Sequence, residues 1–139
     1  MINGLKIHHI GVVVKQISEV SNILENTFEF DKKSIPFDDI FQKVKILFIS
    51  IGNMQIELIE PLQNDSPVKK FLEKGGGIHH IAYETQNFDK DIKKLLDLGS
   101  KPLQEEPTLG FEGRRIFFFY MPKSGFKVIE LIENKINVR

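Results

Sequence analysis

The chain has 139 residues, of which 41% are hydrophobic and 27% are charged, a composition typical of one ordinary globular domain. Nineteen basic residues balance nineteen acidic residues, so there is no electrostatic reason to expect nucleic acid or an anionic membrane as a partner. The absence of cysteine excludes disulfides, thiolate catalysis and sulfur-ligated metal sites. With no visible signal peptide and no apolar run of membrane-spanning length, we expect a cytoplasmic protein.

The first half of the chain is predicted to form four strands and one helix. β-branched residues and alternating polarity favour strands over residues 5–14, 30–37, 42–50 and 54–60. After the first strand, Val20, Ile23 and Leu24 recur near helical spacing. They predict an amphipathic helix over residues 18–28, with Ser18 at its N-cap. The predicted order is β-α-β-β-β.

Residues 63–77 are the predicted connector between the two halves. Ser66 and Pro67 favour a helix start, because a serine N-cap is followed by a proline at the first helical position. We expect this helix over residues 68–74. Gly75-Gly76-Gly77 then ends it.

The second half repeats the order of the first. Strands are predicted over residues 78–85, 100–106, 114–120 and 126–133, with turns at 109–113 and 122–125. Asn87 suits the N-cap of an amphipathic helix over residues 88–98, and Gly99 suits its C-terminal stop. The sequence therefore predicts two β-α-β-β-β modules.

Two short phrases of the sequence occur twice. Ile7-His8-His9-Ile10 returns as Ile78-His79-His80-Ile81 after 71 positions. Ile56-Glu57-Leu58-Ile59-Glu60 returns as Ile129-Glu130-Leu131-Ile132-Glu133 after 73 positions. Two phrases at nearly one offset indicate two copies of one structural unit.

Residues of metal-ligand type occupy equivalent positions in the two copies: His9, Glu57, His80 and Glu130. Side chains alternate across a strand, so His9 shares a face with Gly11 and Val13, whereas His8 faces the other way. If the two copies curve into one cup, one His and one Glu from each converge on its floor. The residues alone leave a structural role for each side chain open, and they leave the choice within each His pair open.

The chemistry of this donor set favours a divalent metal ion. Two neutral imidazoles and two carboxylates suit zinc, nickel, cobalt or manganese. Four protein ligands leave one or two positions of a six-coordinate ion free for a substrate carbonyl. The ion would then act as a Lewis acid that stabilises an enolate.

The doubled module with these His and Glu positions resembles the vicinal oxygen chelate superfamily, which includes the glyoxalase, bleomycin resistance and dioxygenase proteins. Within it, the chain is most similar to the methylmalonyl-CoA epimerase family. The resemblance runs through nearly the whole chain, in the order of that family. Its phrases are His8-His9-Ile10-Gly11, Glu57-Leu58-Ile59-Glu60-Pro61-Leu62, Asp65-Ser66-Pro67, Phe71-Leu72-Glu73-Lys74, Gly77-Ile78-His79-His80-Ile81-Ala82, Glu105-Glu106-Pro107, Pro122-Lys123 and Ile129-Glu130-Leu131.

The resemblance implies an α+β fold in a single domain over residues 1–139. Module 1 (1–62), the connector helix (63–77) and module 2 (78–134) would form one cup-shaped mixed β-sheet with helices on the outside, often in a homodimer. The implied metal ligands are His9, Glu57, His80 and Glu130, with Glu130 also acting on the substrate. The implied reaction is epimerisation of methylmalonyl-CoA or a related acyl-CoA through an enolate.

Some features of the chain depart from the epimerases. Some of these enzymes carry an additional glutamate on the third strand, whereas residues 42–46 contain no acid here. Some have glutamine where this chain has Glu57, and His-Glu-His-Glu is also the ligand set of bacterial glyoxalase I. A glyoxalase I-like lyase and a non-catalytic small-molecule binder are therefore the alternatives. An extradiol dioxygenase is disfavoured, because Glu57 would crowd a three-ligand iron site.

Arg114 and Arg115 are the remaining residues of interest, at the start of a predicted strand. A guanidinium matches the geometry of a carboxylate or a phosphate, so one of them could bind the substrate. The simpler interpretation is that both are solvated charges at a strand end.

Overall fold

The computed structural model describes residues 1–134 and contains two compact units. The first unit is His9–His79, and the second unit combines Met1–His8 with the chain from His80 onward. Strand β1 (Lys6–Val13) enters the first unit, and strand β6 (Gly77–Thr85) leads back into the second. The last five residues of the predicted domain range 1–139 lie outside the described part of the chain.

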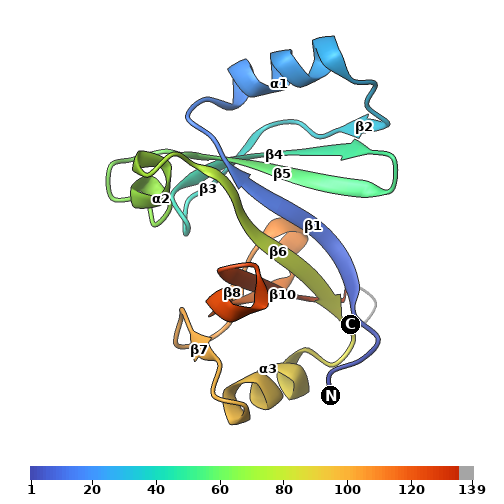
Figure 1. Ribbon diagram of the computed structural model, residues 1–139, viewed down its shortest axis with the longest axis vertical. Coiled ribbons are helices and arrows are strands. Elements are labelled where there is room, and N and C mark those ends of the chain that lie inside the picture. The colour runs from blue at the N-terminus through green and yellow to red at the C-terminus, as the bar shows by residue number, and fades with distance from the viewer. Residues whose placement is uncertain (135–139) are drawn as a thin grey trace. The chain divides into compact units, whose positions relative to one another are not determined.

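The first unit is a mixed sheet with helix α1 packed on one face (Figure 1). Its elements after β1 are α1 (Ile17–Thr27), β2 (Lys32–Lys33), β3 (Phe37–Asp39), β4 (Val44–Ile51), β5 (Met54–Pro61) and α2 (Lys69–Glu73). The strand order is β2-β4-β5-β1, and β3 also pairs with β4. β4 and β5 form an antiparallel hairpin across Gly52, while β1 runs parallel to β5. Ile17 of α1 packs with Leu47, Ile49 and Leu58 of the hairpin.

The second unit has the same kind of construction (Figure 1). Its elements after β6 are α3 (Phe88–Asp97), β7 (Lys101–Pro102), β8 (Thr108–Leu109), the 3₁₀ turn η1 (Phe111–Gly113), β9 (Arg115–Tyr120), the 3₁₀ turn η2 (Pro122–Ser124) and β10 (Val128–Glu133). The strand order is β6-β10-β9-β7, and β8 also pairs with β9. Helix α3 packs on β10 and buries Phe88, Ile92 and Leu95. The predicted α+β class with two modules of one plan is confirmed.

The predicted strand over residues 100–106 is reduced to β7, and the short strands β3 and β8 were not predicted. The side chain of Gln104 explains the shortening, because it forms hydrogen bonds with the β9 backbone that the backbone of a longer strand would otherwise form. Its Oε1 accepts from the Phe118 N–H at 3.0 Å, and its Nε2 donates to the Ile116 carbonyl at 3.2 Å. Periodicity cannot reveal a side chain that replaces ladder hydrogen bonds.

Both serine N-caps predicted from the sequence are wrong. Helix α1 has its N-cap at Gln16, and Glu60 Oε1 of β5 accepts the Ile17 N–H at 2.7 Å. Helix α2 has its N-cap at Val68, two residues after Ser66. A contact distant in sequence decides the first helical residue of α1. The local turn decides the first helical residue of α2. The predicted stop at Gly99 agrees with its φ of +87°, which favours glycine.

The outward face of α1 also differs from the prediction. Val20 and Leu24 pack toward the sheet as expected, but Ile23 is 57% exposed.

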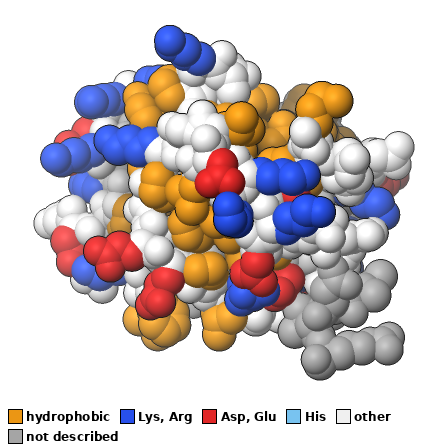
Figure 2. Space-filling view, turned by 90° about the horizontal axis from the view of Figure 1, so that it is seen from below, with side chains coloured by type: hydrophobic (Ala, Val, Ile, Leu, Met, Phe, Trp, Pro, Cys, Tyr) orange, Lys and Arg blue, Asp and Glu red, His pale blue; other side chains and the backbone are white. Residues whose placement is uncertain are grey.

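Acidic, basic and hydrophobic side chains intermingle on the face of the molecule in Figure 2. Within residues 1–134, no helix is long and apolar enough to cross a membrane.

Candidate metal centre

In the first unit, adjacent parallel strands place His9 beside Glu57. The strand register sets Gly11 opposite Glu57, and His9 precedes Gly11 by two residues, which keeps all three on one face. His9 Nε2 lies 3.4 Å from Glu57 Oε1. His9 is 2% exposed and Glu57 is 7% exposed. His8, on the opposite face of β1, is only partly buried.

The second unit repeats this arrangement. Ala82 lies opposite Glu130 in the parallel register of β6 and β10, and His80 precedes Ala82 by two residues. His80 Nε2 lies 3.0 Å from Glu130 Oε1, and the two residues are 2% and 5% exposed. His79 faces away and lies edge-on to Phe71, with ring centroids 5.0 Å apart.

A phenylalanine completes each pair, and sequence reasoning missed this role. Phe48 of β4 is directly opposite Glu57, and Phe118 of β9 is directly opposite Glu130. Phe48 lies edge-on to His9 at 5.4 Å, and Phe118 lies edge-on to His80 at 5.7 Å, between ring centroids. The signal was present, because the two phenylalanines are 70 positions apart, close to the offset of the repeated phrases. Each ring limits the rotation of its imidazole.

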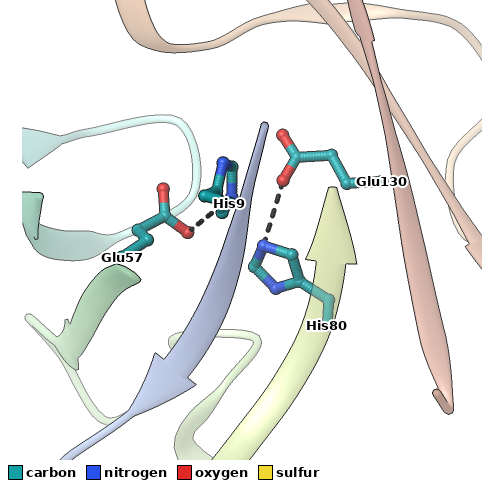
Figure 3. Close-up of side chains that lie close together, drawn as sticks. All are labelled: His9, Glu57, His80 and Glu130. Atoms are coloured by element: carbon teal, nitrogen blue, oxygen red, sulfur yellow. Dashed lines mark ion pairs between the residues drawn. The ribbon is translucent and has the colours of Figure 1, made fainter. Parts of the chain in front are cut away.

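The geometry within each pair fits two ligands of one ion. Figure 3 shows the pairs His9–Glu57 and His80–Glu130. Two atoms about 2.1 Å from one ion, at an angle between octahedral and tetrahedral, lie roughly 3.0–3.4 Å apart. The observed separations of 3.4 Å and 3.0 Å match this range. Each pair offers one imidazole nitrogen and one carboxylate oxygen, in surroundings where an unpaired charge would be costly.

The two arginines have different positions. Arg115 lies on the α3 side of the second unit, where Glu133 and then Asp89 raise the pKa of its guanidinium through hydrogen bonds. Its guanidinium also lies 4.8 Å from the centre of the Phe88 ring. Arg114 pairs instead with Glu84 and Glu112. These contacts give Arg115 a structural role, whereas the Nε of Arg114 has no hydrogen-bond partner among the described residues.

Known proteins resemble this chain over most of its length. Residues 8–118 match the family described as Glyoxalase/Bleomycin resistance protein/Dioxygenase superfamily. The chain is 30% identical over 132 residues to the mitochondrial methylmalonyl-CoA epimerase of Dictyostelium discoideum, covering 94% of this chain and 78% of the relative. It is 30% identical over 129 residues to an ethylmalonyl-CoA/methylmalonyl-CoA epimerase of Cereibacter sphaeroides, covering 91% of this chain and 96% of the relative.

Solved structures give the same result. A variant of the Streptomyces coelicolor methylmalonyl-CoA epimerase, in complex with 2-nitronate-propionyl-CoA, superposes with a TM-score of 0.79 at 29% identity. The match covers 94% of this chain and 97% of that chain. Fold and sequence therefore agree over almost the full length of both proteins.

Proposed function

The chain belongs to the Glyoxalase/Bleomycin resistance protein/Dioxygenase superfamily, and on that premise we propose that it is a metal-dependent epimerase of methylmalonyl-CoA or a related acyl-CoA. One observation carries the proposal: each unit holds a buried His–Glu pair of the same construction on adjacent parallel strands. Its relatives named above are epimerases of such acyl-CoA thioesters.

The proposed ligands of one divalent ion are His9, Glu57, His80 and Glu130, each of which offers one ligand atom. Nitrogen and oxygen donors in equal number suit cobalt, nickel, zinc or manganese. When bound, such an ion supplies Lewis-acid stabilisation of the negative charge that develops on a thioester oxygen.

The protein residues supply the remaining chemistry. In the proposal, Glu130 removes the α-proton of the acyl group, and the resulting enolate is reprotonated at the same carbon from its opposite face. His80 Nε2 and Glu130 Oε1, which lie 3.0 Å apart, are both ligand atoms in the proposal, which leaves Glu130 Oε2 for the proton. Ala82 and Phe118 lie directly opposite Glu130 on its two neighbouring strands, so they flank the carboxylate. A homodimer in the cytoplasm remains the expectation from the sequence.

The first experiment is α-proton exchange of methylmalonyl-CoA in heavy water, followed by NMR, with metal-free protein and again after adding cobalt. We expect fast exchange only with cobalt, and loss of at least about 100-fold in Glu130→Gln. Interconversion of the separated epimers is the confirming step. Absence of exchange by protein with proven bound metal would overturn the assignment of this substrate.

Histidine variants test whether His9 or its neighbour His8 is the metal ligand. His9→Asn should abolish stoichiometric cobalt binding, whereas His8→Asn, a matched change one residue away on the opposite face, should retain it. Equal loss in both variants would contradict the proposed ligand set. If the metal binds but methylmalonyl-CoA does not exchange, the hemithioacetal of methylglyoxal tests the lyase alternative. Ligand binding without turnover of either substrate would identify a binding protein.

A further inference from the structure

Arg114 lies on the same face of the second unit as Glu130. Phe118 is directly opposite Glu130, and Ile116 is directly opposite Ile132. Arg114 continues β9 in an extended conformation, with φ −75° and ψ 145°. Because side chains alternate along a strand, Arg114, Ile116 and Phe118 share one face. Along β9, Arg114 lies roughly 14 Å from Phe118, at about 3.4 Å per residue.

The two edges of the Arg114 guanidinium are held unequally. Nη1 donates to Glu84 Oε2 at 2.9 Å. Nη2 lies 3.3 Å from Glu112 Oε1, which makes a longer contact. Nε is buried and has no hydrogen-bond partner among the described residues. The edge formed by Nε and Nη2 is therefore the one that a two-oxygen group could occupy side-on.

Glu112 reaches this edge from a tight loop. Gly110 packs on Ile116 so closely that a Cβ at position 110 would lie 2.9 Å from Ile116 Cδ1. Glu112 has a φ of +61°, a conformation that residues with a side chain seldom adopt, and Gly113 follows with a φ of +70°. The Glu112 side chain remains one-third exposed, so it can leave Arg114 for solvent.

We propose that the Nε–Nη2 edge of Arg114 binds an anionic two-oxygen group of the ligand, and that Glu112 occupies this edge until the ligand arrives. The exchange replaces one carboxylate by another anion, so the charge around the partly buried guanidinium is conserved. It also satisfies the Nε–H, which otherwise stays buried without an acceptor. Glu84 holds the guanidinium in place on its other side throughout the exchange.

The identity of the anion rests on the proposed function. In an acyl-CoA of the malonyl type it is either the free carboxylate of the acyl group or a phosphate of coenzyme A. Both present two oxygens at the spacing that a guanidinium edge matches.

The test uses NMR of the arginine Nε–H signals of the full chain, titrated with malonate, inorganic phosphate, malonyl-CoA and acetyl-CoA. Arg114→Lys assigns the Arg114 signal. We expect malonate or phosphate to shift it in the wild-type protein. We expect a larger shift at equal concentration in Glu112→Gln, because the neutral side chain competes less for the guanidinium. Glu106→Gln, an exposed acid of the same segment, is the matched control and should behave as the wild type.

The four probes separate the sources of the anion. If the carboxylate is the group bound, malonyl-CoA should bind about tenfold more tightly than acetyl-CoA, and Arg114→Lys should remove most of that difference. If a phosphate is bound, the two thioesters should bind alike, both should shift the Arg114 signal, and Arg114→Lys should weaken both. A shift by malonate or phosphate without binding of either thioester supports the anion site and removes the acyl-CoA function. An Arg114 signal that no probe moves, in the wild type and in Glu112→Gln, overturns the inference.

Discussion

Phe118 lies edge-on to the imidazole of His80, with ring centroids 5.7 Å apart and an interplanar angle of 86°. The same phenylalanine is directly opposite Glu130 in the antiparallel register of β9 and β10. Phe118 thus contacts the imidazole of His80 and also faces Glu130, whose carboxylate is paired with that imidazole. Phe48 repeats both relationships with His9 and Glu57 in the first unit.

Replacement of Phe118 should therefore weaken metal binding. In Phe118→Leu the imidazole of His80 gains rotational freedom, and we expect the cobalt dissociation constant to rise about tenfold. Phe117→Leu is the matched control, because Phe117 belongs to the same strand but packs on the α3 side. Calorimetric titration with cobalt measures both variants. The interpretation fails if the control loses as much affinity as Phe118→Leu.

Metal binding should stabilise the folded chain. Cobalt at 100 times its dissociation constant should add about 2.7 kcal/mol to the free energy of unfolding. Thermal unfolding with and without chelator measures this difference. It should vanish in Glu130→Gln, which removes one charged donor atom. An equal cobalt effect in this variant would show that the ion binds elsewhere.

A side chain at position 110 should destabilise the loop before β9. A Cβ there would lie 2.9 Å from Cδ1 and 3.0 Å from Cγ2 of Ile116, which is 3% exposed. Gly110→Ala should therefore lower the free energy of unfolding by about 1–3 kcal/mol. Gly113→Ala meets no atoms within 4 Å, and only its φ of +70° resists the change, at roughly 1 kcal/mol. Urea unfolding that ranks Gly113→Ala as the more damaging change would contradict the packing argument.

Arg115 should contribute to stability through its shape as well as its charge. Its guanidinium donates two hydrogen bonds to Asp89 and two to Glu133, and it stacks near Phe88. Lysine keeps the charge but loses this fork geometry, so Arg115→Lys should destabilise the chain by about 1 kcal/mol. The value is small because the Arg115 side chain is partly exposed. Urea unfolding checks the value. Full stability in Arg115→Lys would show that charge alone suffices.

The pair Lys43–Asp65 should produce a dependence of stability on acid pH. The hydrogen bond from Lys43 lowers the pKa of the Asp65 carboxyl below its ordinary value. Because the pKa of Asp65 is lower in the folded state, the pair stabilises the fold at pH values above the ordinary pKa of aspartate. That contribution is lost as the pH falls through the folded pKa, below about pH 4. NMR titration of the Asp65 carboxyl carbon should give a midpoint below that of Lys43→Met. Identical midpoints would rule out the pair in solution.

Much of the fold could be predicted because its signals are local and repeated. Alternation along β1 and β6 separates His9 from His8 and His80 from His79 whatever the strands pair with. The helix starts could not be predicted in the same way. Glu60, 43 positions away, bonds the first N–H of α1, and no local pattern at Ser18 contains that information.

The sequence by itself determined the two modules and the α+β class, since period and repetition are properties of the chain alone, and its family resemblance supplied the four candidate ligands. Only the tertiary structure decided which side chains surround those ligands. Strand register placed Phe48 and Phe118 opposite the glutamates, and it decided that Arg114 lies on the Glu130 face of the sheet and Arg115 on the α3 side. Register depends on hydrogen bonds between segments far apart in the chain, and a shift of one residue would exchange the faces.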